Sequence, residues 1–398
     1  MNALTQPVGA PTSQRALTSV AGLCAMVFAE FLAMGLPLPV LPEHVSGALG
    51  FGPFVVGLAI GAQSWATLLT RPAAGTRSDH RGPQSTAVLG LALSALAGAL
   101  MATSSFLSAA NASLTVLLVG RGLLGLGESL VITSALSWGV GLAGRERTGL
   151  VMAWVGIAMY GALAIGAPIG SALFARFGFV GVALAAAVAP LFGLIPALLT
   201  KTIATVGTTR LPLRTVARLI WLPGLGLTSS ALGFGAIAAF SALRFKEAGW
   251  SHAPLAMVAF GAAYVLARLV FGRLPDRFGG ARVALGSTAI AGVGQTLMWL
   301  APGPGIAIAA AGLTGLGFSL AFPAFGVEAI KHVPPQNRGV AVGAFAACFD
   351  LAMGVGVPAL GLAVGAFGLA SAFAIGALGA LLALIVALVL LRTKVVPS

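Results

Sequence analysis

The sequence predicts an all-α integral membrane protein with twelve transmembrane helices, arranged as two parallel pseudo-repeats of six. Three observations support this fold class. The composition is unusually apolar, the apolar runs are long enough to cross a bilayer, and the second half of the chain repeats motifs of the first half.

The composition excludes most soluble classes of protein. Hydrophobic residues make up 58% of the 398 residues, charged residues make up 8%, and the mean hydropathy is +1.02. A soluble domain has about 25% charged residues, so this chain cannot cover a globular surface with its charges. A soluble enzyme, a disordered chain and a disulfide scaffold are therefore excluded, and a β-barrel would alternate apolar and polar residues.

The apolar runs predict where the chain crosses the membrane. A helix rises about 1.5 Å per residue, so about 20 apolar residues span a bilayer core of roughly 30 Å. Breaking the chain at charges, proline clusters and polar residues gives twelve spans: 17–41, 53–73, 84–106, 113–138, 147–174, 179–200, 217–243, 253–272, 282–301, 305–327, 338–363 and 368–391.

The basic residues predict the orientation of these spans. Most of the 22 Lys and Arg residues fall in the loops and ends on one side, whereas Arg176, Arg244 and Lys246 fall on the other. Cytoplasmic loops carry the excess of Lys and Arg, so both termini are expected on the cytoplasmic side of a bacterial inner membrane. The net charge of +13 is then explained by topology, and no nucleic-acid partner is expected.

An internal repeat divides the chain into two halves. The pattern G-x3-D-x2-G at 75–82 recurs 197 positions later at 272–279, and the glycine-rich run 122–130 recurs 190 positions later at 312–320. These matches predict an N-terminal six-helix bundle (1–200), a cytoplasmic linker (201–216) and a C-terminal six-helix bundle (217–398). Parallel repeats of this kind place a substrate site between the halves, near the bilayer midplane.

Three motifs resemble those of the major facilitator superfamily, and in particular its drug/proton antiporter branch. The 75–82 loop and its copy resemble motif A, the run from Arg121 to Gly127 resembles motif B, and the run 166–171 resembles motif C. The run 322–339 is similar to that of YhhS-type bacterial exporters. The resemblance implies a gating role for Arg71, Gly75, Asp79, Gly82, Arg268, Gly272, Asp276 and Gly279, and helix packing by Gly166, Pro168 and Gly170.

Four charged residues lie deep in predicted spans, where burial costs several kcal/mol. Glu30 lies in the first span, Arg121 and Glu128 in the fourth and Asp350 in the eleventh. The equivalent positions in the opposite half are uncharged. Arg121 corresponds to Ala311, Glu128 to Phe318 and Asp350 to Tyr160. A scaffold needs its glycines in both halves, whereas a proton relay is needed once, so these four residues are predicted to act in proton coupling or substrate binding.

Structural roles remain open for the same residues. Arg121 and Glu128 lie seven positions apart on one helix face. They could therefore form a salt bridge whose role is to fix helix packing. Each carboxylate could instead be satisfied by local hydroxyls or by Arg121. Arg71 and Arg268 are expected in a charge network at the cytoplasmic rim. Candidates for lining a substrate cavity are Phe31, Gln63, Trp65, Tyr160, Phe240 and Phe349.

These features predict a proton-coupled efflux antiporter that moves a small organic molecule by alternating access. The alternative is a nutrient importer, a symporter or uniporter, in which Arg121 holds a small anionic or sugar-like solute. A membrane sensor is a third class. No catalytic centre, cofactor or metal is expected, since the four histidines are scattered and predicted to be solvated. The expected partners are the substrate and the lipid bilayer, and the protein is expected to be a monomer.

Overall fold

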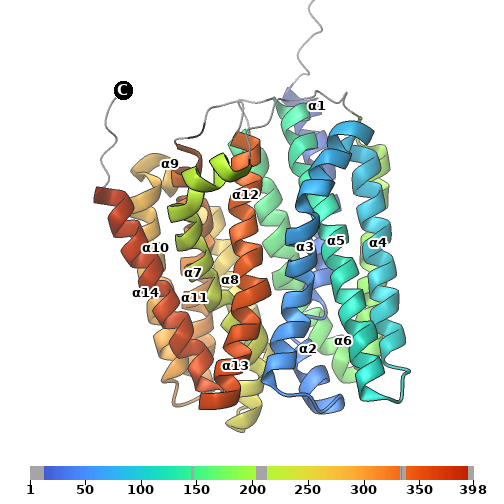
Figure 1. The fold of residues 1–398 in the computed structure, drawn as a ribbon, viewed down its shortest axis with the longest axis vertical. Helices are drawn as coiled ribbons and strands as arrows, with labels where there is room; N and C mark the ends of the chain where they lie inside the picture. Colours follow the sequence, from blue (N-terminus) through green and yellow to red (C-terminus); the bar gives the residue numbers. More distant parts are fainter. Residues whose placement is uncertain (1–12, 145–147, 203–212, 332, 334–337, 393–398) are drawn as a thin grey trace, which may run out of the picture.

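The structure is a computed structural model that describes residues 13–144, 148–202, 213–331, 333 and 338–392. In these ranges the chain is helical with no strand, as predicted (Figure 1). Most of the predicted linker 201–216 and part of the run 322–339 lie outside the described residues.

The first half contains α1 (Ser13–Gly35), α2 (Leu41–Glu43), the π-helix η1 (His44–Ala48), α3 (Pro53–Arg81), α4 (Pro83–Ser104), α5 (Ala110–Ala143) and α6 (Thr148–Leu199). The second half contains α7 (Leu213–Glu247), α8 (Pro254–Phe271), α9 (Leu274–Phe278), α10 (Gly280–Trp299), α11 (Pro304–Lys331), α12 (Arg338–Leu351), the π-helix η4 (Ala352–Gly356), α13 (Val357–Phe367) and α14 (Ala370–Arg392).

The described helices give twelve membrane crossings. Nine helices are long and apolar enough to span a bilayer, with α12, η4 and α13 counted as one helix and α6 counted once. Helix α6 holds two spans, because Gly178 breaks it with φ 63° and ψ −165°, a backbone conformation that glycine adopts without steric cost. The shorter helix α1 and the 20-residue α10 complete the twelve.

The first span is shorter than predicted. It was expected to continue to residue 41, but α1 ends at Gly35 and a turn leads to α2. Pro37 and Pro39 lie in this turn, and because proline has no backbone N–H it cannot continue a helical hydrogen-bond ladder. This turn places α2 at the end of the bundle opposite the start of α1, and η1 follows it directly (Figure 1).

Helices α1–α6 pack mainly against one another, as do α7–α14, and the two bundles stand side by side (Figure 1). The bundles meet along two pairs of helices. We call the contact of α3 with α12, η4 and α13 the first seam, and the contact of α6 with α8 the second seam. The repeat relates α3 to α8 and the first part of α6 to α12–α13, so the two seams occupy equivalent positions.

The repeated glycines of motif B explain how the helices cross within each half. A Cβ atom at Gly125 of α5 would run into the carbonyl oxygen of Gln63 on α3. The equivalent Gly315 of α11 would meet the carbonyl oxygen of Phe260 on α8 in the same way. Both crossings therefore need a residue without a side chain, which is why these glycines occur in both halves.

The two ends of the bundle differ in charge. One end carries Arg77, Arg81, Arg273, Arg277 and Arg282, and we call it the arginine-rich end. The first described residues of α1 and the end of α14 lie at this end, at the top of Figure 1. The opposite end carries α2, η1 and the break in α6.

Candidate functional site

An ion pair joins the two halves across the first seam. The guanidinium of Arg71 on α3 donates a hydrogen bond through Nη2 to Oδ2 of Asp350 on α12. The two side chains are only 14% and 4% exposed. Arg71 was expected in a charge network at the rim, and its partner is the acid that the sequence placed in the eleventh span of the opposite half.

Glu128 is held by hydrogen bonds from α3 rather than by a cation. Gln63 Nε2 donates to Glu128 Oε2 over 2.7 Å, and Thr67 Oγ1 lies 3.2 Å from the same oxygen. Gln63 and Thr67 are four residues apart and thus share a helix face with Arg71. The polar face of α3 therefore contacts an acid of its own half and an acid of the other half.

Arg121 anchors α5 to α3. Its Nε donates to the carbonyl oxygen of Ala59 over 3.0 Å, and its Nη2 donates to that of Ile60 over 3.2 Å. The side chain is 1% exposed, and Arg121 and Glu128 do not form an ion pair. Arg121 and Glu128 are therefore each bound by hydrogen bonds to α3 rather than by a salt bridge to each other.

Glu30 lies apart from the seams, within the first half. Ser94 Oγ on α4 donates to Glu30 Oε1 over 2.6 Å, and the side chain is buried. The second carboxylate oxygen, Oε2, has no hydrogen-bond partner among the described residues. Of the four predicted membrane charges, only Asp350 crosses between the halves.

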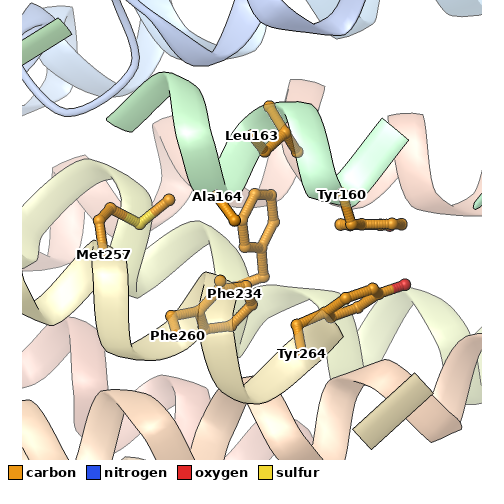
Figure 2. A pocket seen from close by; sticks show the side chains of 8 residues that line it. Tyr160, Leu163, Ala164, Phe234, Met257, Phe260 and Tyr264 are labelled. Atoms are coloured by element: carbon orange, nitrogen blue, oxygen red, sulfur yellow. The ribbon is translucent and has the colours of Figure 1, made fainter. Parts of the chain in front are cut away.

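Aromatic side chains fill the second seam. The ring of Tyr160 on α6 stacks on that of Tyr264 on α8, with centroids 3.9 Å apart and planes at 27° (Figure 2). Phe318 on α11 packs edge-on to Tyr160 at 6.3 Å. A small cavity opens beside the tyrosine pair. It is lined by Tyr160, Leu163, Ala164, Phe234, Met257, Phe260, Gly261 and Tyr264.

Arg268 extends the second seam towards the arginine-rich end. Its Nη1 donates to the carbonyl oxygen of Ser319 over 3.1 Å. Its Nη2 lies 3.4 Å from the point where a Cβ atom on Gly156 of α6 would be, so the guanidinium reaches across to the other half. No acid of the described residues pairs with Arg268. The charge network predicted for this arginine stays a prediction.

The repeat relates the polar first seam to the aromatic second seam. Adding 197 to Arg71 gives Arg268, so both seams carry an arginine at the same place. The residues around these arginines differ completely in chemistry. Gln63 corresponds to Phe260, Thr67 to Tyr264, Glu128 to Phe318 and Asp350 to Tyr160. One seam is thus polar and charged, and its counterpart is aromatic.

Other candidates have different surroundings. Trp65 packs against Gly354 on the first seam, and Phe349 packs near Phe318, 6.1 Å between centroids. Phe31 and Phe240 are buried without lining the cavity. The sequence reasoning missed Thr67, Ser94, Met257 and Phe260, of which the 197-residue offset applied to Gln63 would have found Phe260.

The glycines of motif C pack α6 against the end of α1. Added Cβ atoms at Gly166 and Gly170 would meet the backbone of Gly35 and Leu36. The motif therefore fixes the position where the first span turns towards α2. Pro168 lies inside α6 between the two glycines.

His44 is buried, which contradicts the expectation of a solvated histidine. Its ring stacks on Phe179 with centroids 3.9 Å apart and planes at 5°. It lies in η1, between the first two spans, and burial lowers its pKa to about 4. No cluster of His, Cys, Asp or Glu that could hold a metal occurs in the described part of the chain.

Comparison with known proteins identifies the family. The chain matches the Major Facilitator Superfamily over residues 23–251 and 223–398. The chain belongs to this superfamily. It is therefore a multi-pass membrane transporter, and the seams of this facilitator lie where such proteins place their substrate path.

Relatives and a solved structure support the same assignment. An uncharacterized MFS-type transporter of Salmonella typhimurium is 41% identical over 373 residues, which cover 93% of this facilitator and 96% of the relative. One from Burkholderia pseudomallei is 40% identical over 380 residues, or 94% and 92% of the two chains. The human organic anion transporter MFSD10 (TETRAN) has the same fold, with a TM-score of 0.67, 17% identity and coverage of 96% and 100%.

Proposed function

We propose that this facilitator is a proton-coupled efflux antiporter that exports a small organic molecule through a bacterial inner membrane. The arginine-rich end is the cytoplasmic end, in keeping with the positive-inside rule, and the start of α1 and the end of α14 lie there (Figure 1). Residues 1–200 and 217–398 form the two units that rock against each other. The observation that carries the proposal is the Arg71–Asp350 ion pair across the first seam.

The ion pair supports coupling because a proton can break it. When Asp350 is ionised, its attraction to Arg71 holds α12 against α3 near the arginine-rich end. A proton on Asp350 removes that attraction and leaves the arginine without a charged partner. Since buried ion pairs lose several kcal/mol when one charge is removed, protonation favours the separation of the two helices at the cytoplasmic end.

This sequence of events gives antiport. A proton that enters from the outside neutralises Asp350, and the first seam opens to the cytoplasm. There the proton leaves and the substrate binds. The renewed ion pair closes the seam, and the substrate is released outside. Glu128 on α5 is hydrogen-bonded to Gln63 and Thr67 of α3, on the face of α3 that also carries Arg71. It forms a second proton site.

Everted membrane vesicles from a strain without its own drug pumps test the proposal. ATP-driven proton pumping acidifies the vesicle lumen, and quenching of acridine orange reports the pH gradient. Addition of a substrate of a proton antiporter releases lumenal protons and restores the fluorescence. The probes are ethidium, dansylglycine and dansylcadaverine, compared between the wild type and Asp350→Asn.

The result expected is recovery of fluorescence with at least one probe, and its loss in Asp350→Asn. A substrate that instead deepens the quenching carries protons inward with it, which identifies an importer by symport. No response in the wild type that differs from vesicles without the protein contradicts proton antiport.

A further inference from the structure

The two seams differ in how their arginines are neutralised. On the first seam the chain supplies the acid itself, because Asp350 pairs with Arg71. On the second seam the equivalent arginine, Arg268, lies beside Gly156 and donates to the Ser319 carbonyl oxygen, and no described acid pairs with it. The Arg268 guanidinium is partly buried and has no acid partner among the described residues, so it is free to pair with an anion that the chain does not supply.

We propose that the substrate supplies this anion: it is an aromatic anion whose carboxylate or similar group binds Arg268 between α6 and α8. The guanidinium has the donors for this role, since Nη1 is its one donor with a hydrogen bond to a described residue, Ser319 O. Nη2 reaches across the seam to Gly156 of α6, so the guanidinium lies between the two halves. A carboxylate and a guanidinium form charge-assisted hydrogen bonds of suitable geometry.

The aromatic part of the ligand follows from the neighbouring residues. Tyr264 lies four residues before Arg268 and therefore on the same face of α8, one turn away. Its ring, Tyr160 and the lining of the cavity form an apolar aromatic wall (Figure 2). Aromatic rings favour stacked or edge-on partners. A ring placed there would lie roughly 5–6 Å from an anion on Arg268, about one helical turn.

The assignment rests on the proposed function in that the ligand is taken to be the transported substrate. It also gives each seam one task. The proton acts on the first seam through Asp350, and the ligand binds the second seam through Arg268. Substrate and proton then meet through the movement of the two halves rather than at one carboxylate.

Three probes with one ring system and different charges test the ligand class. Dansylglycine carries a carboxylate, dansylamide is neutral and dansylcadaverine carries an ammonium. Binding to the full-length protein in lipid nanodiscs is measured without a pH gradient, by dansyl emission after excitation of the protein's tryptophans. A failure of proton coupling therefore leaves this measurement unaffected.

We expect the wild type to bind dansylglycine about ten-fold or more tightly than dansylcadaverine. Arg268→Gln is expected to weaken dansylglycine binding about ten- to hundred-fold, as the loss of a charged hydrogen bond does, and to leave dansylamide unchanged. Arg268→Lys should restore part of the affinity. The matched control is Arg273→Gln, which removes an exposed charge five residues away and should bind all three probes like the wild type.

Two results would overturn the proposal. One is equal or tighter binding of dansylcadaverine by the wild type, and the other is dansylglycine binding that does not depend on the charge at position 268. If Arg268→Gln does not fold, the preference of the wild type among the three probes and the Arg268→Lys variant decide the question. Absence of binding by dansylglycine to the wild type also counts against it.

Discussion

Arg71 on α3 and Asp350 on α12 lie 279 positions apart in the chain and form an ion pair that ties the two halves together. Both side chains are largely buried, so neither can be satisfied by water once its partner is removed. The pair is thus both a structural tie and a point at which one proton changes the contact between the halves.

The first prediction concerns the stability of this pair. Asp350→Asn leaves a buried guanidinium without a counter-charge, and Arg71→Gln leaves a buried carboxylate, so each should cost about 3–5 kcal/mol. The double variant leaves neither charge and should be less destabilised than the sum of the single variants. A double-mutant cycle of thermal unfolding temperatures in detergent checks this, and strictly additive effects would contradict a direct interaction.

The second prediction separates the acids proposed to bind protons from an acid with a structural contact. Glu128→Gln and Glu30→Gln are expected to reduce transport driven by a pH gradient about ten-fold or more, since neither amide can bind and release a proton in this pH range. The control is Glu328→Gln. Glu328 Oε1 accepts a hydrogen bond from the N–H of Ala281 and should affect helix α10 rather than coupling.

Everted vesicles with acridine orange measure this effect for all three variants, at matched protein levels. Glu30 is the more demanding case because it is distant from both seams. Gradient-driven transport at the wild-type rate in Glu30→Gln would remove that residue from the coupling pathway and leave it a packing role with Ser94.

The third prediction concerns the helix crossings. Gly125→Ala and Gly315→Ala place a methyl group against a backbone carbonyl of α3 and α8, respectively. Overpacking of this kind costs about 1–3 kcal/mol. Gly122→Ala is the matched control on α5, because a Cβ there meets nothing within 4 Å. It should be neutral or stabilising, since alanine favours a helix.

Folded yield and unfolding temperature after purification measure these three variants. The two crossings are equivalent, so Gly125→Ala and Gly315→Ala should lose comparable stability. A Gly125→Ala protein as stable as Gly122→Ala would mean that α3 and α5 can separate without cost, contrary to the packing described above.

The fourth prediction is a pH dependence due to His44. Burial against Phe179 lowers its pKa to about 4, whereas an unfolded histidine has a pKa of about 6.5. Between these values the unfolded state binds more protons, so the free energy of unfolding falls as the pH is lowered from 6.5 to 4. The loss is at most about 1.4 kcal/mol per pH unit.

His44→Phe isolates this contribution. The phenyl ring keeps the stack on Phe179 but cannot take up a proton, so the variant should lose less stability between pH 6.5 and 4 than the wild type. Thermal unfolding of both proteins across this range is the measurement. Parallel curves for the two proteins would show that His44 does not titrate in the window.

Composition and the repeat were sufficient to predict much of the fold. Long apolar runs have one stable form in a bilayer, and the motif copies located the two halves and the equivalent glycines at 125 and 315. The end of the first span was missed, because Pro37 and Pro39 act on the helix ladder and not on hydropathy.

The site was harder to predict than the fold. The sequence marked Glu128 and Asp350 as unusual, but it could not pair Asp350 with Arg71, because that contact depends on how two bundles meet. The aromatic seam was within reach, since the 197-residue offset takes Gln63 to Phe260 and Thr67 to Tyr264.

The Gln63–Phe260 and Asp350–Tyr160 correspondences have a consequence for how such a molecule could arise. Two copies of a single six-helix chain, assembled as a symmetric dimer, would present identical side chains at both contacts. An acid that is useful at one contact would then also be buried at the other, where it would destabilise the dimer. Fusion into one polypeptide frees each contact to diverge alone. The asymmetry of charge is then a property that only the joined gene product can hold.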